Sequence, residues 1–187
     1  MENLGTVRIE TARLVLRPFR MQDAQAMYDN WANDSQVTKF LTWQPHKNVE
    51  ESRQILAEWT AQYVKPDYYN WAIAWKDHED QVIGSIGIVT LDADVESASI
   101  GYCIGRKWWR QGVMTEAFGG IITFLFEKVG LNRIQASHDT ENPNSGKVME
   151  KCGLKKEGVL RQSARNCQGI CDLCIHGLLA SEYFAQK

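Results

Sequence analysis

Three runs of residues with strand character stand in series in the middle of the chain, and they constrain the fold more than any other feature. The runs are rich in β-branched and aromatic residues, and the polar segments between them are short enough to be hairpin turns. They cover residues 69–75, 82–89 and 98–104. The sequence therefore predicts an antiparallel meander.

A long helix is expected directly after the third run. Apolar side chains recur at three- and four-residue spacing from Met114 to Val129, which is the pattern of an amphipathic helix. Gly130 follows as the residue expected just past its end. The helix should begin at Gly112 or Val113.

The remaining segments predict further elements on both sides of this unit. They are a strand at 11–19 stopped by Pro18, a helix from an Asp23 N-cap to about Trp31, a helix from about Asn48, a strand at 133–137, a helix from Pro143 to Cys152, and two strands around Val159 and Leu173. Antiparallel strands followed by one strand–helix–strand crossover indicate an α+β fold, with a mixed, mostly antiparallel central sheet of about seven strands and flanking helices. We expect one domain over residues 1–187.

Composition excludes several classes of function. The formal net charge of -2 gives no global positive field, so nucleic acid is not an expected partner. No apolar run approaches the roughly 20 residues that span a bilayer, and the N-terminus has no apolar signal segment. We expect a cytoplasmic protein without a membrane partner, and the odd number of five cysteines suits free thiols there.

The junction between the third run and the long helix has the properties of an anion site. A strand ends at Ile104 and a helix opens near Gly112, where the first amides have no intrahelical acceptor and the helix dipole is positive. A diphosphate fits such a place. Arg106, Lys107 and Arg110 add cationic character.

The residues from Trp108 to Ala117 resemble the diphosphate loop, [Gln/Arg]-x-x-Gly-x-[Gly/Ala], of the Gcn5-related N-acetyltransferase (GNAT) superfamily. The chain looks most like the RimJ/RimL branch of ribosomal-protein N-terminal acetyltransferases. The matching pieces, in order, are residues 11–18, 100–102, 115–117, 131–134, 142–145, 150–154 and 157–161.

This resemblance implies the GNAT acyl-CoA N-acyltransferase fold and an acetyl-CoA-dependent N-acetyltransferase, an acyltransferase enzyme. Acetyl-CoA would be the co-substrate, with no metal, and a primary amine would attack its thioester directly. The acceptor is a protein or peptide N-terminus, or a small amine. A non-catalytic acyl-CoA-binding module is the alternative, and the resemblance also allows a homodimer.

The resemblance also assigns the coenzyme-binding residues. They are Cys103, Ile104, Arg110, Gln111, Gly112, Val113, Met114, Thr115, Asn142 and Ser145. Two positions depart from the family loop, because Trp109 stands in place of Gln/Arg and Met114 in place of the last small residue. We expect backbone amides to bind the phosphates, with Arg110 supplying charge and Met114 packing inward.

Catalysis by resemblance falls to Tyr102, Asn142 and Ser145. Tyr102 belongs to the strand whose free backbone groups receive the acetyl arm, and an N–H near Cys103 or Ile104 would polarise the thioester carbonyl. Met149 occupies the place of a family Tyr and cannot donate a proton, so Ser145 or a water is the expected thiolate acid.

The general base has no single candidate. Ser99 replaces a Glu that relatives often carry. The candidates that remain are Glu96, His138, Asp139, Glu157 and Asp172, or a chain of waters.

Two patterns resemble metal sites but are interpreted otherwise. Cys167, Cys171 and Cys174 match a bare iron–sulfur spacing, yet an offset of three along a strand sends the last two to opposite faces, which favours free thiols. The four His residues lack metal-ligand spacing, so no zinc site is predicted.

Overall fold

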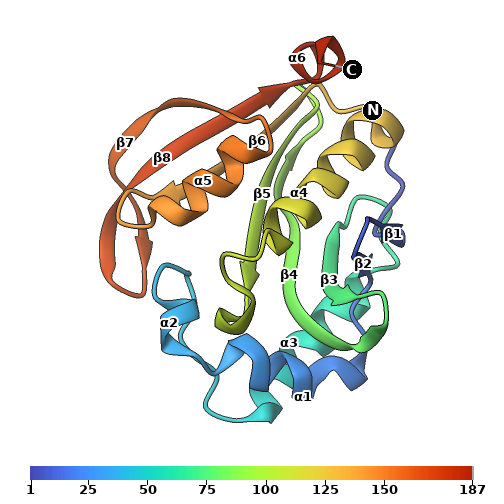
Figure 1. Ribbon diagram of the computed structural model, residues 1–187, viewed down its shortest axis with the longest axis vertical. Helices are drawn as coiled ribbons and strands as arrows, with labels where there is room; N and C mark the ends of the chain where they lie inside the picture. The colour runs from blue at the N-terminus through green and yellow to red at the C-terminus, as the bar shows by residue number, and fades with distance from the viewer. Residues whose placement is uncertain (187) are drawn as a thin grey trace.

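The computed structural model describes residues 1–186, and one eight-stranded sheet forms its centre (Figure 1). The strand order is β1-β2-β3-β4-β5-β6-β8-β7, and β5–β6 is the parallel pair in a sheet otherwise antiparallel. The strands are β1 (Ile9–Glu10), β2 (Leu14–Arg17), β3 (Asn70–Trp75), β4 (His78–Asp92), β5 (Ser97–Ile104), β6 (Arg133–Asp139), β7 (Lys155–Asn166) and β8 (Gly169–Leu179). The predicted mixed, mostly antiparallel sheet is confirmed, with one strand more than expected.

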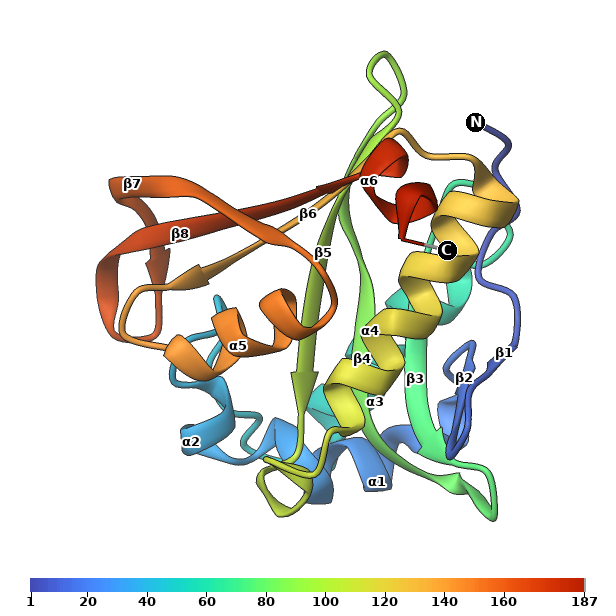
Figure 2. The same cartoon turned by 45° about the horizontal axis from the view of Figure 1, so that its top comes forward.

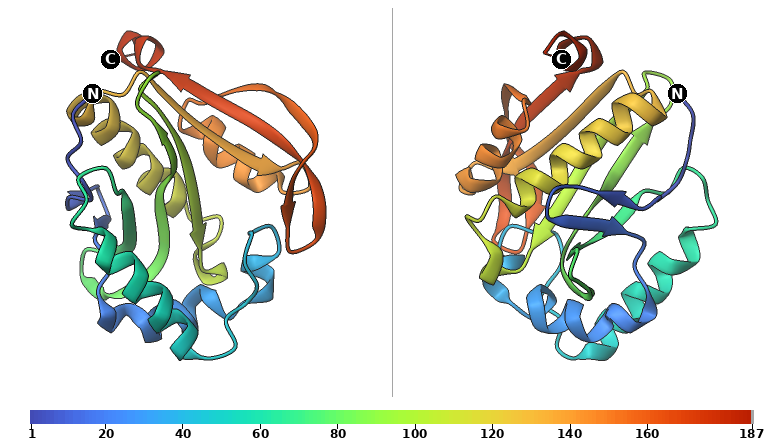
Figure 3. Two further views of the ribbon diagram at one scale, coloured as in Figure 1. Left: turned by 180° about the vertical axis from the view of Figure 1, so that it is seen from behind. Right: turned by 45° about the vertical axis from the view of Figure 1, so that its right-hand side comes forward.

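Helices cover both faces of this sheet (Figure 3). After α4 the chain continues as the π-helical segment η4, and the π-helical segment η2 follows α1 in the same way. The helices are η1 (Met21–Asp23), α1 (Ala24–Met27), η2 (Tyr28–Ala32), α2 (Ser35–Thr38), α3 (Val49–Gln62), η3 (Arg106–Trp108), α4 (Val113–Phe124), η4 (Leu125–Val129), α5 (Pro143–Lys151) and α6 (Ala180–Ala185). None of the helices within residues 1–186 has both the length and the apolar character that crossing a membrane requires.

The core is divided by the sheet into two apolar clusters. On one face, Phe118 and Ile121 of α4 pack with Trp71 of β3 and Met149 of α5, all nearly inaccessible to water. On the other, Trp31 and its neighbours in α1 and α3 pack against the reverse side of the same strands. Strands β3 and β4 contribute side chains to both clusters, and β4 pairs with β5 up to Ile104. This packing holds the end of β5 in place.

Local signals in the sequence explain where several elements begin and end. The side chain of Asn48 accepts a hydrogen bond from the amide of Glu51 at 3.2 Å and so caps α3. Gly130 has a φ of 76°, the left-handed conformation that closes a helix, and it ends the segment that α4 begins. Both termini were predicted at these residues.

Asp23 occupies the N-cap position of α1, as expected, but its side chain makes no capping hydrogen bond to that helix. Its carboxylate is buried and receives both terminal nitrogens of Arg17, each at 2.8 Å. The helical segment begins earlier, at Met21, and the Asp23 carboxylate accepts the amide of Arg20 at 2.7 Å. The ion pair with β2 therefore decides the role of this residue.

Candidate functional site

Strands β5 and β6 lie side by side at one end and diverge at the other (Figure 2). Their parallel pairing comprises Ser97 with Arg133, Ala98 with Ile134 and Ser99 with Gln135. Beyond Ser99 the two strands have no paired residues within the described chain. The gap that opens there runs from the middle of the sheet to the start of the loop before α4.

The hydrogen-bonding alternation of β5 determines which backbone groups face the gap. Gly105 donates its amide to the carbonyl oxygen of Ile83 at 2.9 Å, and the register pairs Ile104 with Gly84. In an antiparallel ladder every second residue bonds to a given neighbour. The N–H and C=O groups of Tyr102 and Ile104 therefore point toward β6, whereas those of Cys103 point toward β4. Of the two amides expected to polarise the thioester, this alternation favours Ile104.

The loop between β5 and α4 presents free amides at its end. Arg110 has a φ of 61° and Gly112 a φ of 74°, so the backbone turns through two left-handed residues before the helix. The first amide of α4 with a backbone acceptor belongs to Glu116, which donates to the carbonyl oxygen of Gly112 at 3.0 Å. The amides of residues 112–115 thus have no backbone acceptor within residues 1–186, as the anion-site prediction requires.

The three cations around this loop are not equivalent. Arg106 forms an ion pair with Asp34 at 3.0 Å, and the Lys107 ammonium lies 5.5 Å from the ring centre of Trp108. Arg110 is exposed and has no ion-pair partner within residues 1–186. Arg110 is therefore the cation best placed to contact an anion that binds the free amides of this loop.

The two positions that depart from the family loop have structural roles. Trp109 donates its indole N–H to the carbonyl oxygen of Ile104 at 2.9 Å, which ties the loop back onto the end of β5. Met114 is 6% exposed and packs in the core beneath α4. The inward packing predicted for Met114 is confirmed, and Trp109 takes up one of the carbonyls that would otherwise face the gap.

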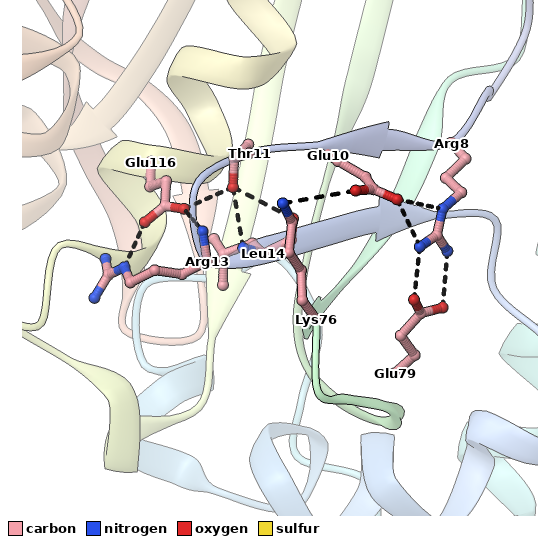
Figure 4. A network of polar contacts seen from close by, with 8 residues as sticks. All are labelled: Arg8, Glu10, Thr11, Arg13, Leu14, Lys76, Glu79 and Glu116. Carbon is pink, nitrogen blue, oxygen red and sulfur yellow. Dashed lines mark hydrogen bonds and ion pairs between the residues drawn. The ribbon is translucent and has the colours of Figure 1, made fainter.

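Arg13 braces the start of α4 from outside the sheet (Figure 4). Its Nε donates to Glu116 of α4 at 2.6 Å, and a terminal nitrogen donates to the carbonyl oxygen of Gln111 at 3.3 Å. Thr11 adds a bond to the same carboxylate at 2.6 Å. Burial alone would raise the pKa of Glu116, but the hydrogen bonds from Thr11 and from the backbone amide and side chain of Arg13 outweigh it, so this pKa lies below its ordinary value. These contacts connect the turn between β1 and β2 to the loop between β5 and α4.

Tyr102 and Ser145 meet across the gap. The hydroxyls lie 2.9 Å apart, and the Tyr102 hydroxyl also donates to the carbonyl oxygen of Ser145 at 3.0 Å. Burial raises the pKa of Tyr102, so this phenol keeps its proton throughout the physiological range. Two of the three residues expected to act in catalysis are thus in direct contact.

The third residue, Asn142, lies at the N-cap of α5, but its side chain makes no capping hydrogen bond. Pro143 follows at the first helical position, as predicted. The side-chain amide of Asn142 therefore makes no hydrogen bond to the first turn of α5. Met149, on the same helix, is 1% exposed and belongs to the core.

The candidate bases fall into two groups, the carboxylates, which bind other residues, and His138. Glu96 pairs with the N-terminal amine at 2.7 Å and Glu157 with Arg133, both at the end where β5 and β6 are joined. Asp139 accepts the side-chain amide of Asn166 at 2.6 Å and the backbone amide of Glu141 at 2.8 Å. These contacts commit the three carboxylates to structural partners.

His138 differs, because it lies against α5 next to Ser145. A Cβ added at Gly146 would come within 2.5 Å of its Nε2, so the imidazole sits directly beneath that turn of the helix. Asp172 accepts the amide of Gln162 at 2.8 Å at the far edge of the sheet. His138 is thus the candidate base nearest to Ser145 by its contacts.

A pocket of about 480 Å³ lies where the β7–β8 turn meets the loop after α2. Cys167 joins the two segments, because its amide donates to the carbonyl oxygen of Leu41 at 3.0 Å and its thiol to that of Trp43 at 3.1 Å. Figure 1 shows both segments near the open end of the gap between β5 and β6. The pocket is lined by Thr42, Gln44, Arg165, Asn166, Cys167, Gln168 and Gly169.

All five cysteines are free thiols, as expected. Two of the four histidines, which lack metal-ligand spacing in the sequence, come together in the fold. His138 and His176 stack with ring centres 5.3 Å apart, and Cys174 lies beside both. Sequence spacing missed this cluster because His138 is far from the other two in the chain and reaches them only through the pairing of β6 with β8.

Known proteins that are similar to this chain are acetyltransferases. The family model described as the acetyltransferase (GNAT) domain matches residues 13–155. YoaA of Bacillus subtilis, an uncharacterized N-acetyltransferase, is 34% identical over 154 residues, which cover 82% of this chain and 86% of that protein. The [ribosomal protein uS5]-alanine N-acetyltransferase of Escherichia coli is 27% identical over 166 residues, covering 85% and 84%.

A solved structure of RimL, the ribosomal L7/L12 alpha-N-protein acetyltransferase, in complex with coenzyme A is similar in fold. It superposes with a TM-score of 0.83 at 17% identity, and the match covers 94% of this chain and 99% of that one.

Proposed function

The chain belongs to the acetyltransferase (GNAT) family and is an acetyl-CoA-dependent N-acetyltransferase; we propose that its acceptor is the N-terminal α-amine of a protein. Relatives of the RimJ/RimL type, one named as an N-acetyltransferase of alanine in ribosomal protein uS5 and one as a ribosomal-protein-serine acetyltransferase, support this acceptor class. We further propose that residues 1–187 act as one domain in the cytoplasm.

The gap between β5 and β6 is the observation that carries the proposed site. The diphosphate of acetyl-CoA would bind the free amides of residues 112–115, with Arg110 beside it. The pantetheine arm would then enter the gap beside the amide of Ile104 and point toward Tyr102. The thioester would lie between Ile104 and Ser145.

In this arrangement the acceptor nitrogen attacks the thioester carbonyl carbon directly. The amide of Ile104 would stabilise the oxyanion of the tetrahedral intermediate. When the carbon–sulfur bond breaks, Ser145 would give its hydroxyl proton to the thiolate, and the proton that the acceptor nitrogen loses would return to Ser145 through water. The Tyr102 hydroxyl, 2.9 Å away, would hold the Ser145 hydroxyl in position. Asn142, whose side chain does not cap α5, would position the arm.

Three candidate carboxylates within residues 1–186 are bound to other residues, and this favours an α-amine over a lysine. An α-amine has a pKa of about 7.7–8.0 and a lysine about 10.4, so at pH 7.5 about a third of the former but only roughly 0.1% of the latter is neutral. An enzyme whose Glu96, Glu157 and Asp139 are engaged elsewhere is suited to an amine that is already neutral. The pocket at Cys167 would admit the peptide from the side opposite α5.

The test measures release of coenzyme A thiol with two matched peptides. One carries a free N-terminal Ala or Ser and no lysine, and the other has an acetylated N-terminus and one internal lysine. We expect kcat/KM to be at least 100-fold higher for the first. Equal rates, or a preference for the lysine peptide, would contradict the proposed acceptor. Tight coenzyme binding by calorimetry without thiol release on either peptide or on small amines would favour the binding-module alternative.

A further inference from the structure

His138, Cys174 and His176 project from one face of the sheet toward α5. Cys174 and His176 are two residues apart on β8 and so share a face, and Cys174 is the direct cross-strand partner of His138 on β6. One potential ligand atom from each lies within 4.8 Å of the other two. The backbone pairing alone therefore brings a thiol and two imidazoles together.

Two of the three residues are buried: Cys174 is 4% and His176 is 1% exposed, whereas His138 is half-buried. Helix α5 lies over the strands β6 and β8 that carry them (Figure 1). At Gly146 the helix has no side chain, and this lets the imidazole of His138 lie against the backbone. A larger residue there would displace the ring, so the space occupied by His138 depends on this glycine.

The outer nitrogens of both rings face hydrogen-bond acceptors. Nδ1 of His138 lies 2.8 Å from the carbonyl oxygen of Asp139, which places a proton on Nδ1 and leaves the Nε2 lone pair free. Nε2 of His176 is buried without a hydrogen-bond partner, 3.8 Å from a Glu150 oxygen. Its Nδ1 faces the Cys174 sulfur at 4.0 Å. Metal-bound histidines characteristically direct their second nitrogen at a carbonyl or carboxylate in this way.

We propose that this cluster binds a divalent cation of the Zn²⁺ class through Cys174 Sγ, His176 Nδ1 and His138 Nε2. A thiolate with two imidazoles suits Zn²⁺, whereas Mg²⁺ and Ca²⁺ require oxygen ligands. Bonds of about 2.0–2.3 Å in a tetrahedron separate ligand atoms by roughly 3.5 Å, so the sulfur and Nδ1 need to approach by about half an ångström. A water completes the four ligands, and the thiol proton passes to solvent on binding.

The bound ion would join β6 and β8 beneath α5 and stabilise the strand pairing behind Ser145. Its role is therefore in the stability of the sheet under the catalytic helix. It takes no part in the acetyl transfer itself, so the proposal stands apart from the identity of the acceptor.

Cobalt titration of the chelator-treated full chain tests this directly. We expect one equivalent of Co²⁺ to produce a thiolate-to-cobalt charge-transfer band and visible bands of tetrahedral intensity, both displaced by Zn²⁺. Cys174→Ser should abolish the charge-transfer band. Cys171→Ser, on the same strand but the opposite face, is the matched control and should retain it.

Thermal unfolding provides a second readout on the same proteins. Zn²⁺ should raise the Tm of the wild type and of Cys171→Ser, and leave that of Cys174→Ser unchanged. Absence of a charge-transfer band in the wild type at one equivalent overturns the site even if Cys174→Ser fails to fold. Persistence of the band in a folded Cys174→Ser protein overturns it as well.

Discussion

The hydroxyl of Tyr102 lies 2.9 Å from that of Ser145, which joins the strand beside the gap to the helix that covers it. If Ser145 protonates the leaving thiolate, Ser145→Ala should lower kcat by about 100-fold, since general acids contribute roughly 10²–10⁴ in rate. Tyr102→Phe should lower kcat by about tenfold, because the serine remains but loses its partner. KM for acetyl-CoA should change little in either variant. Steady-state kinetics give both constants.

Ser181→Ala is the control for this pair, because Ser181 is exposed on α6 at the other end of the sheet. It should match the wild type. A Ser145→Ala enzyme within twofold of wild-type kcat would remove Ser145 from the proposed mechanism.

Arg13 should affect coenzyme binding rather than turnover. Arg13→Gln loses the bonds to Glu116 and to the carbonyl of Gln111, so the loop amides should lose their alignment and KM for acetyl-CoA should rise by about tenfold, the effect of roughly 1.4 kcal/mol. The matched control is Arg8→Gln, which belongs to the distant half of the same polar network and pairs with Glu79. It should leave KM unchanged, and an equal rise in both variants would show that the network acts only on stability.

Gly112 and Gly119 should respond to alanine with opposite signs. Gly112 has a φ of 74°, so Gly112→Ala should destabilise the fold by about 1 kcal/mol and raise KM for acetyl-CoA. Gly119 lies inside α4 with nothing within 4 Å of an added Cβ, and Gly119→Ala should stabilise by about 0.5–1 kcal/mol. Urea unfolding measures both changes. Two changes of the same sign would contradict the left-handed turn at Gly112.

Acid should weaken the fold through His176. Burial, followed by the neighbouring His138, lowers the pKa of His176 below its ordinary value. The unfolded state therefore binds a proton first, and this contribution to stability is full above about pH 6.5 and is lost as pH falls toward the folded-state pKa. In chelator-treated protein, His176→Asn should show a smaller loss of Tm between pH 7 and pH 5 than the wild type. His78→Asn, an exposed histidine on β4, should follow the wild-type curve; identical curves for all three would exclude this origin.

Periodicity and local signals were enough to predict most elements. The apolar spacing from Met114 onward predicted α4, the helix expected from about Asn48 is α3, and the loop at Gly112 predicted the free amides. These features depend on residues that are neighbours along the chain, so they can be read directly from it. The two-residue strand β1 and the short helices α2 and α6 contain too few residues for a period to show.

The failures share a long-range cause. Asp23 has the chemistry of a helix cap, but the buried guanidinium of Arg17 takes its carboxylate. The order β6-β8-β7 is not written in any local pattern, and this order assembles His138 with Cys174. The Tyr102–Ser145 contact likewise depends on how α5 lies over the gap. The resemblance proposed the candidate site residues, whereas their mutual contacts required the fold.

Strand β7 forms one outer edge of the sheet, and its pairing with β8 shifts register twice, between Lys156 and Gly158 and between Leu160 and Ala164. Such bulges, together with the charged residues Lys155 and Arg161, interrupt the regular row of amides and carbonyls that another strand would need as a template. The opposite edge, β1, is only two residues long. Neither border can readily extend the sheet into a second molecule, so the architecture guards against edge-to-edge aggregation, and any stable pairing of two copies would have to use helices or sheet faces.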